Sequence, residues 1–127
     1  MTESPNIDEQ YINGESIENY VARLAEAKAK KVARKHFNSI VIGSDQALAC
    51  DGKILGKPSD HENAKKQLMA MSNKTISFHT GLCVMNSSRD KSEKDVIIYR
   101  VCFRKLGEQE IEDYLLKEQP YSCVGSF

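Results

Sequence analysis

The chain has 127 residues, of which 40% are hydrophobic and 28% are charged, a composition typical of a folded globular domain. Eighteen basic residues balance 18 acidic residues, so the formal net charge is zero. This balance argues against attraction to nucleic acid or to an anionic membrane as the main activity. No apolar run approaches the ~20 residues of a membrane-spanning helix, and no basic and apolar leader opens the chain. We expect one domain over residues 1–127, in the cytoplasm, with no nucleic-acid or membrane partner.

The cysteines give no sign of a metal centre. Four of them lie far apart, without a Cys-x-x-Cys pair or a Cys/His cluster: Cys50, Cys83, Cys102 and Cys123. A structural zinc site needs closely spaced ligands, so we interpret these residues as small core side chains in a reducing compartment.

The first regular element is a helix predicted over Glu15–His36. Apolar residues recur there at three- and four-residue spacing, and the interior contains no Gly or Pro. Lys28 interrupts this apolar stripe, since it falls between Leu24 and Val32. Two interpretations stay open: the lysine stem lies along the helix margin with its ammonium in water, or the ammonium points into a polar cleft.

Charge is unevenly distributed along the same region. Residues 1–22 hold five acids and no base, whereas residues 23–36 hold six bases and one acid. An acidic start and a basic end complement the helix dipole, which explains most of these residues. Nucleic-acid binding by the basic stretch Arg23–Lys35 is a weaker alternative, because no aromatic residues lie among the bases.

Short strands follow the first helix. Ser39–Gly43 is an apolar, β-branched run that predicts a buried strand. Ala47–Cys50 and Lys53–Leu55 flank Asp51-Gly52, a dipeptide typical of hairpin turns.

The second half of the chain alternates helices and longer strands. A helix is predicted over Ser59–Ser72, with Ser59 and Glu62 spaced as a capping box. Strands are predicted over Lys74–Asn86, with Ile76, Phe78, Leu82 and Val84 on one face, and over Asp95–Leu106, with Ile97, Tyr99, Val101 and Phe103 on one face. A last helix is predicted over Glu108–Lys117. The order α-β-β-β-α-β-β-α indicates an α/β domain, in which helices flank a mixed, largely antiparallel sheet.

Two residues stand where a ligand could approach. Asp45 follows the predicted strand at Ser39–Gly43, and the ends of strands in α/β folds open into ligand crevices. The alternative is an aspartate that caps its own turn. Lys57 lies between Gly56 and Pro58, a rigid mount for an ammonium that meets phosphate, or otherwise an ordinary loop lysine.

Further acids lie near the N-terminus. Glu3, Asp8 and Glu9 are candidate oxygen ligands for Mg²⁺, or only a polar approach to the first helix. Carboxylates and lysines without a nucleophile dyad favour metal-assisted attack of water on a phosphoanhydride over covalent catalysis.

The order of several motifs resembles the Maf family of nucleotide pyrophosphatases over essentially the whole chain. The matching residues are Asp8-Glu9, Leu24–Ala29 with Lys28, Ile42–Gln46, Asp51-Gly52, Gly56–Pro58, Thr80–Leu82, Val101–Arg104 and Gln119–Phe127. The resemblance implies a Maf and ITPase-like fold. It also implies that this chain lacks the family's N-terminal strand and helix, with its phosphate-binding loop, and its C-terminal segment.

The resemblance also implies a set of site residues. Asp45 matches the family's general base, and Glu9 matches a second essential acid, with both at the divalent metal, Mg²⁺ or Mn²⁺. Lys28 and Lys57 match lysines that bind the triphosphate, and Gln46 matches a position tied to base selection.

The implied reaction cleaves between the α- and β-phosphates of a nucleoside triphosphate. Gln46 after Asp45 is similar to the branch that hydrolyses 7-methyl-GTP, whereas the branch acting on dTTP and UTP usually has Thr there. The alternatives are a dTTP or UTP pyrophosphatase, and a catalytically impaired fragment that binds nucleotides or partners. A homodimer is a further expectation.

Overall fold

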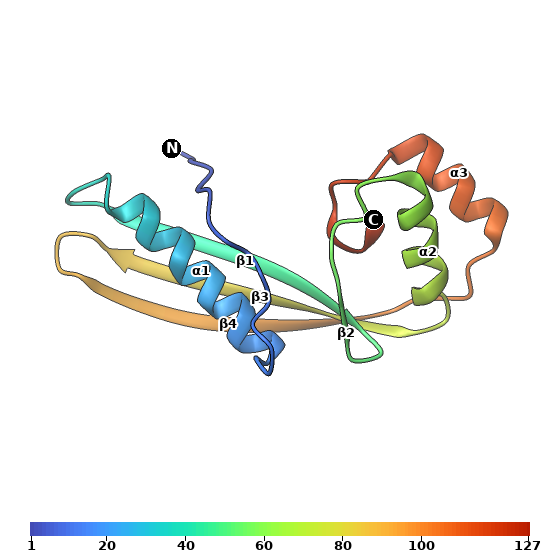
Figure 1. The fold of residues 1–127 in the computed structure, drawn as a ribbon, viewed down its shortest axis with the longest axis horizontal. Helices are drawn as coiled ribbons and strands as arrows, with labels where there is room; N and C mark the ends of the chain where they lie inside the picture. Colours follow the sequence, from blue (N-terminus) through green and yellow to red (C-terminus); the bar gives the residue numbers. More distant parts are fainter. The chain divides into compact units, whose positions relative to one another are not determined.

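The computed structural model describes all residues, 1–127, as three α-helices and a four-stranded sheet (Figure 1). The elements in chain order are α1 (Ile17–Ala33), β1 (Ile40–Cys50), β2 (Lys53–Leu55), α2 (His61–Met71), β3 (Thr75–Asn86), β4 (Lys91–Cys102), α3 (Glu108–Glu118) and the short 3₁₀ turn η1 (Val124–Ser126). The strand order in the sheet is β2-β1-β3-β4. None of the helices combines the length and the apolar character that a bilayer crossing requires.

The sheet is antiparallel. Cys50 pairs with Lys53 across the predicted hairpin, where Asp51 and Gly52 both have positive φ angles of 51° and 74°. The predicted Asp-Gly turn is therefore confirmed, because both central residues of a type I′ turn need positive φ. Between β1 and β3, Ser87 donates to Ser39 at 3.0 Å and Gln46 donates to Thr80 at 2.9 Å, so residue numbers rise on one strand as they fall on the other.

All three predicted helices are present, and their ends differ from the predicted ones by up to three residues. Ser16 caps α1 by accepting from the Asn19 amide at 3.1 Å. The predicted capping box of Ser59 and Glu62 is wrong. Asp60 caps α2 instead, accepting from the Asn63 amide at 2.8 Å, while Ser59 has a positive φ of 70°. Aspartate is as strong an N-cap as serine, and the chain reaches its helical conformation one residue later.

Strand β1 is the main correction to the predicted order. The sequence predicts two strands, 39–43 and 47–50, separated by a turn, whereas one continuous strand covers Ile40–Cys50. The element order is therefore α-β-β-α-β-β-α. The first part of β1 is also not buried on both faces, since Ile40 and Ile42 are exposed while Val41 and Gly43 are covered.

The buried faces of the long strands also differ from the prediction. Ile76 is buried as expected, but further along β3 the buried residues are His79, Gly81, Cys83 and Met85 rather than Leu82 and Val84. Strand β3 contributes Ile76 to one core cluster and Cys83 and Met85 to another, so the buried alternation changes phase along it. Ile97 and Tyr99 on the edge strand β4 are largely exposed.

The chain divides into two compact units. The first contains residues 1–46 and 79–98, with a core of α1 side chains against β1 and β3: Ala25, Ala29, Val41, Cys83 and Met85. The second contains residues 47–78 and 99–127, where α2, α3 and the C-terminal turn enclose residues that include Leu48, Leu68, Met71 and Leu115. Cys50 and Cys83 are buried as expected, whereas Cys102 and Cys123 are exposed.

Candidate functional site

Two glycines set the distance between α1 and the sheet in the first unit. A Cβ atom on Gly43 of β1 would lie 2.3 Å from the Ala25 carbonyl oxygen, and one on Gly81 of β3 would lie 2.3 Å from the Val21 carbonyl oxygen. Real Cβ atoms do not come so close to backbone, so only glycine allows this approach. Helix α1 therefore rests directly on β1 and β3 (Figure 1).

This close packing brings Lys28 to Asp45. Strand residues two apart point to the same face, so Asp45 follows Val41 and Gly43 on the face that α1 covers. The Lys28 ammonium donates to Asp45 Oδ1 at 2.6 Å, and Glu9 Oε1 lies 3.0 Å from the same nitrogen. The side chains of Lys28 and Asp45 are 20% and 11% exposed, whereas that of Glu9 is 54% exposed. The ammonium of Lys28 therefore does not simply end in water: it points into a polar site and lies between two carboxylates.

The environment of Lys28 keeps it charged. Burial lowers its pKa, but hydrogen bonds and charges from Asp45 and Glu9 outweigh burial, so the pKa is raised. Nearby, burial and the negative charges of Asp45 and Glu9 raise the pKa of Tyr20. Asp45 and Glu9 thus contribute to both pKa shifts.

The structure separates the three N-terminal acids that the sequence offers as metal ligands. Asp8 accepts from the Gln10 amide at 3.0 Å and so closes its own turn. Glu3 binds Lys35 at 2.6 Å and His36 at 2.9 Å, near the far end of α1. Glu9 alone among the three contacts Lys28.

The remaining predicted residues lie elsewhere. Gln46 is exposed and follows Asp45 directly, so its side chain leaves the opposite face of β1, where it donates to Thr80. Lys57 belongs to the second unit, on the exposed loop between β2 and α2. Asp45 itself lies inside β1 rather than past its end, and it is not a turn residue, so both predicted backbone settings for it are wrong. Gly43 allows α1 to approach the strand closely, and it does not form the predicted turn.

Glu9 and Asp45 suit a divalent cation that also binds phosphate. No group of three or more His, Cys, Asp or Glu side chains gathers anywhere in the chain, so a complete protein cage is absent. Mg²⁺ commonly takes only one or two carboxylates and completes its shell with water and substrate phosphate oxygens. Glu9 and Asp45, which both contact the Lys28 ammonium, fit a site of this kind, with two protein carboxylates and the remaining ligands from water and phosphate.

Sequence reasoning missed two residues that surround this group. Tyr20 falls on the apolar spacing of the predicted helix, four residues before Leu24, yet its hydroxyl donates to the Glu9 carbonyl at 2.7 Å. Arg23 donates to the Gln10 carbonyl at 2.9 Å and to both oxygens of Glu15. No spacing signal identifies either residue, because their partners lie in a segment without regular structure.

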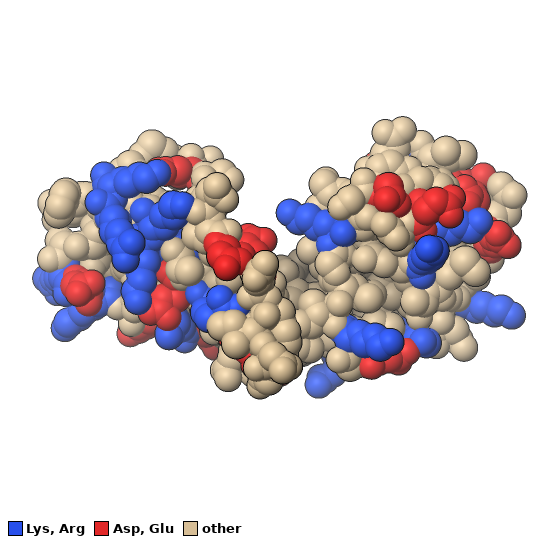
Figure 2. All heavy atoms as spheres, viewed as in Figure 1, with Lys and Arg blue, Asp and Glu red and all other residues tan.

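The basic half of α1 is a separate feature. Figure 2 shows Lys and Arg side chains gathered over the C-terminal half of this helix. Several are already paired: Lys30 with Glu26, Lys35 with Glu3, and Lys31 with the Asn6 carbonyl. The two carboxylates, Glu26 and Glu3, offset part of the positive charge that a nucleic acid would meet.

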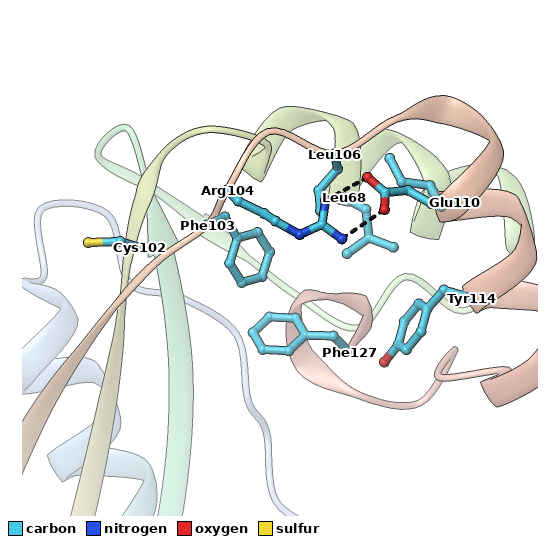
Figure 3. A pocket seen from close by; sticks show the side chains of 9 residues that line it. Leu68, Cys102, Phe103, Arg104, Leu106, Glu110, Tyr114 and Phe127 are labelled. Atoms are coloured by element: carbon cyan, nitrogen blue, oxygen red, sulfur yellow. Dashed lines mark hydrogen bonds and ion pairs between the residues drawn. The ribbon is translucent and has the colours of Figure 1, made fainter.

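A cavity of about 460 Å³ lies in the second unit (Figure 3). The rings of Phe103, Tyr114 and Phe127 line it, together with the ion pair of Arg104 and Glu110 at 2.8 Å. None of the predicted site residues lines this cavity. Its aromatic lining and its already paired charges distinguish it from the carboxylate and lysine group in the first unit.

Comparison with known proteins identifies relatives of the chain. It is 48% identical over 124 residues to a 7-methyl-GTP pyrophosphatase of Methylobacillus flagellatus, which covers 98% of this chain and 65% of that protein. It is also 48% identical to proteins of the same name from Nitrosococcus oceani and Idiomarina loihiensis, over 98% and 97% of this chain and 62% and 63% of theirs. The chain thus spans less than two thirds of the length of these relatives. Residues 1–127 match the family described as Maf-like protein, and the chain belongs to that family.

Proposed function

We propose that this chain carries the carboxylates and a phosphate-binding lysine of a nucleoside triphosphate pyrophosphatase that acts on 7-methyl-GTP. One observation carries the proposal: Lys28 lies 2.6 Å from Asp45 and 3.0 Å from Glu9, although the three residues are remote in sequence. The names of the relatives support the reaction and the nucleotide.

Asp45 is the proposed general base. It accepts the proton of a water molecule whose oxygen attacks the α-phosphorus. A new P–O bond forms there, and the bond from this phosphorus to the oxygen bridging the α- and β-phosphates breaks. The products are a nucleoside monophosphate and pyrophosphate. A carboxylate on a strand within a packed unit is well fixed for this transfer, and its low exposure limits competition from bulk water.

Lys28 is the proposed phosphate-binding residue. An ammonium has three N–H donors, and the two carboxylates engage two of them. The third is available to a phosphate oxygen, and the raised pKa keeps the charge in place. Positive charge at the pyrophosphate leaving group lowers the barrier, because negative charge accumulates there as the bond breaks.

Glu9 and Asp45 are the proposed ligands of Mg²⁺ or Mn²⁺. When bound, the metal neutralises charge on the phosphate oxygens. Lys57 and Gln46 stay as proposals for triphosphate binding and base selection. Lys57 lies on an exposed loop of the second unit, and Gln46 lies on the opposite face of β1. Each role can therefore be tested by its own variant.

The test is pyrophosphate release from a panel of nucleotides. The purified 127-residue chain is incubated with 7-methyl-GTP, GTP, UTP or dTTP and with Mg²⁺ or Mn²⁺. We expect turnover of 7-methyl-GTP well above that of the others. Faster release from UTP or dTTP would contradict the nucleotide assignment. Binding of 7-methyl-GTP without any release would support a nucleotide-binding fragment instead.

A further inference from the structure

The segment that carries Glu9 has no regular secondary structure. Residues 1–12 lie alongside α1, outside any helix or strand (Figure 1). A carboxylate on such a segment faces Lys28 reliably only where other side chains fix the backbone. The contacts of residues 8–11 with α1 therefore decide where Glu9 points.

Tyr20 provides a direct contact to this backbone. Its hydroxyl donates to the carbonyl oxygen of Glu9 at 2.7 Å. The Tyr20 ring also meets the Tyr11 ring edge-on, with centroids 5.5 Å apart and planes at 70°. One α1 side chain thus contacts the segment by a hydrogen bond at Glu9 and by an aromatic pair two residues later.

Arg23 fixes the next residue along the segment. Its guanidinium donates to the Gln10 carbonyl at 2.9 Å while a fork of two bonds, at 2.8 and 3.0 Å, holds it on Glu15. The turn closed by Asp8 on the Gln10 amide adds a local constraint. The backbone carbonyls of two successive residues, Glu9 and Gln10, are thus bound by Tyr20 and Arg23, which lie about one turn apart on α1.

The helix places Tyr20 and Lys28 on the same side. Tyr20, Leu24 and Lys28 follow one another at four-residue steps, so they lie along one side of α1. Leu24 is buried in the core, which prevents the helix from rotating. The side that holds the Glu9 backbone is therefore the side that presents the ammonium to its carboxylate.

We propose that Tyr20 is a positioning residue: its hydroxyl fixes the backbone at Glu9 so that the Glu9 carboxylate faces Lys28 and Asp45. Only the predicted effect of Tyr20 on turnover rests on the proposed function; its effect on the backbone at Glu9 does not. The proposed role of Tyr20 is therefore exerted through Glu9, whose carbonyl it binds.

The matched pair of variants is Tyr20→Phe and Tyr11→Phe. Both remove one phenolic hydroxyl from the same aromatic pair. The Tyr11 hydroxyl donates to the Glu15 carbonyl and does not contact Glu9. Only Tyr20→Phe removes the bond to Glu9, so a difference between the two variants reports on that bond.

The first readout is backbone mobility by ¹⁵N relaxation. For residues 8–10 we expect order parameters of about 0.8 in the parent chain and in Tyr11→Phe, and below about 0.6 in Tyr20→Phe. Order parameters that are equal in all three proteins would overturn the inference, whatever the enzyme activity.

The second readout is turnover of 7-methyl-GTP. We expect Tyr20→Phe to lower kcat about tenfold with little change in KM, as for loss of one hydrogen bond that matters in the transition state. In a Glu9→Gln background the same substitution should have no further effect, because Tyr20 acts through Glu9. An equal tenfold loss in both backgrounds would contradict the inference. An inactive parent chain would overturn the proposed function, and the relaxation measurement would still decide the role of Tyr20.

Discussion

At the scale of single residues, Lys28 is the departure from an ordinary amphipathic helix. It lies on the stripe of α1 that also carries Val21 and Leu24, both buried, yet it ends between two acids. Removing the ammonium would leave Asp45, 11% exposed, and Glu9 close together without their shared cation. Lys28 therefore stabilises the fold as well as the proposed site.

We expect Lys28→Met to lower the free energy of unfolding by about 1–2 kcal/mol, below the value for a fully buried pair because Glu9 is half exposed. Lys30→Met is the control, because Lys30 is 53% exposed and pairs only with Glu26 one turn away. It should change stability by less than about 0.5 kcal/mol. Urea unfolding of both variants measures the difference, and a more stable Lys28→Met would contradict the role of the ammonium.

The pH dependence of this difference follows from the pKa of Lys28. The folded pKa is raised above the ordinary value of 10.5. The stabilisation is thus fully present below pH 10.5 and is lost as pH rises through the higher folded value. We expect the same stability difference between the parent and Lys28→Met at pH 7 and pH 9, and a smaller one above pH 10.5.

At the scale of elements, the contact of α1 with the sheet depends on Gly43 and Gly81. Gly43→Ala would force backbone or helix to move, since the new Cβ meets the Ala25 carbonyl at 2.3 Å. We expect a loss of about 1–3 kcal/mol in unfolding free energy, typical of overpacking. Gly56→Ala is the matched control, because nothing lies within 4 Å of its Cβ position. Equal stability of the two variants would show that α1 does not rest on Gly43.

The start of α3 provides a second test at this scale. Glu110 accepts two bonds from the Arg104 guanidinium and one, at 2.6 Å, from the Gly107 amide, and these contacts lower its pKa from 4.5 to about 2. A depressed carboxylate pKa gives stability that is present above pH 4.5 and is lost as pH falls towards 2. As pH falls from 4.5 to 2, the free energy of unfolding of Glu110→Gln should therefore decrease less than that of the parent. Thermal melts across that range test this, and parallel curves would count against it.

The elements that were predictable from sequence are those with strong local signals. Periodicity located α1 and α3, and Asp51-Gly52 located the hairpin, because these features depend on neighbours in the chain. The turn predicted at Gly43–Gln46 is wrong, because the glycine there allows a close contact with a helix. The buried face of β3 was also not predictable, because it depends on which core each part of the strand meets.

At the scale of the whole molecule, the candidate site is predictable only in part. Family motifs supplied Glu9, Lys28 and Asp45, and the structure brings these three together in the first unit. Lys57 lies in the second unit, so its share in nucleotide binding stays a prediction. The anchors Tyr20 and Arg23 required the fold, because their partners are backbone carbonyls that carry no sequence signal.

The most direct test of the account is pyrophosphate release from 7-methyl-GTP by the parent chain, Asp45→Asn and Asp113→Asn. Asp113 is an aspartate on α3 in the second unit, bonded to Gln109, and provides the matched control. Loss of a general base lowers rates by about 10²–10⁴-fold. We therefore expect Asp45→Asn to lose at least a hundredfold in kcat while Asp113→Asn keeps the parent rate. Turnover by Asp45→Asn at the parent rate would contradict the assignment of this carboxylate as the base.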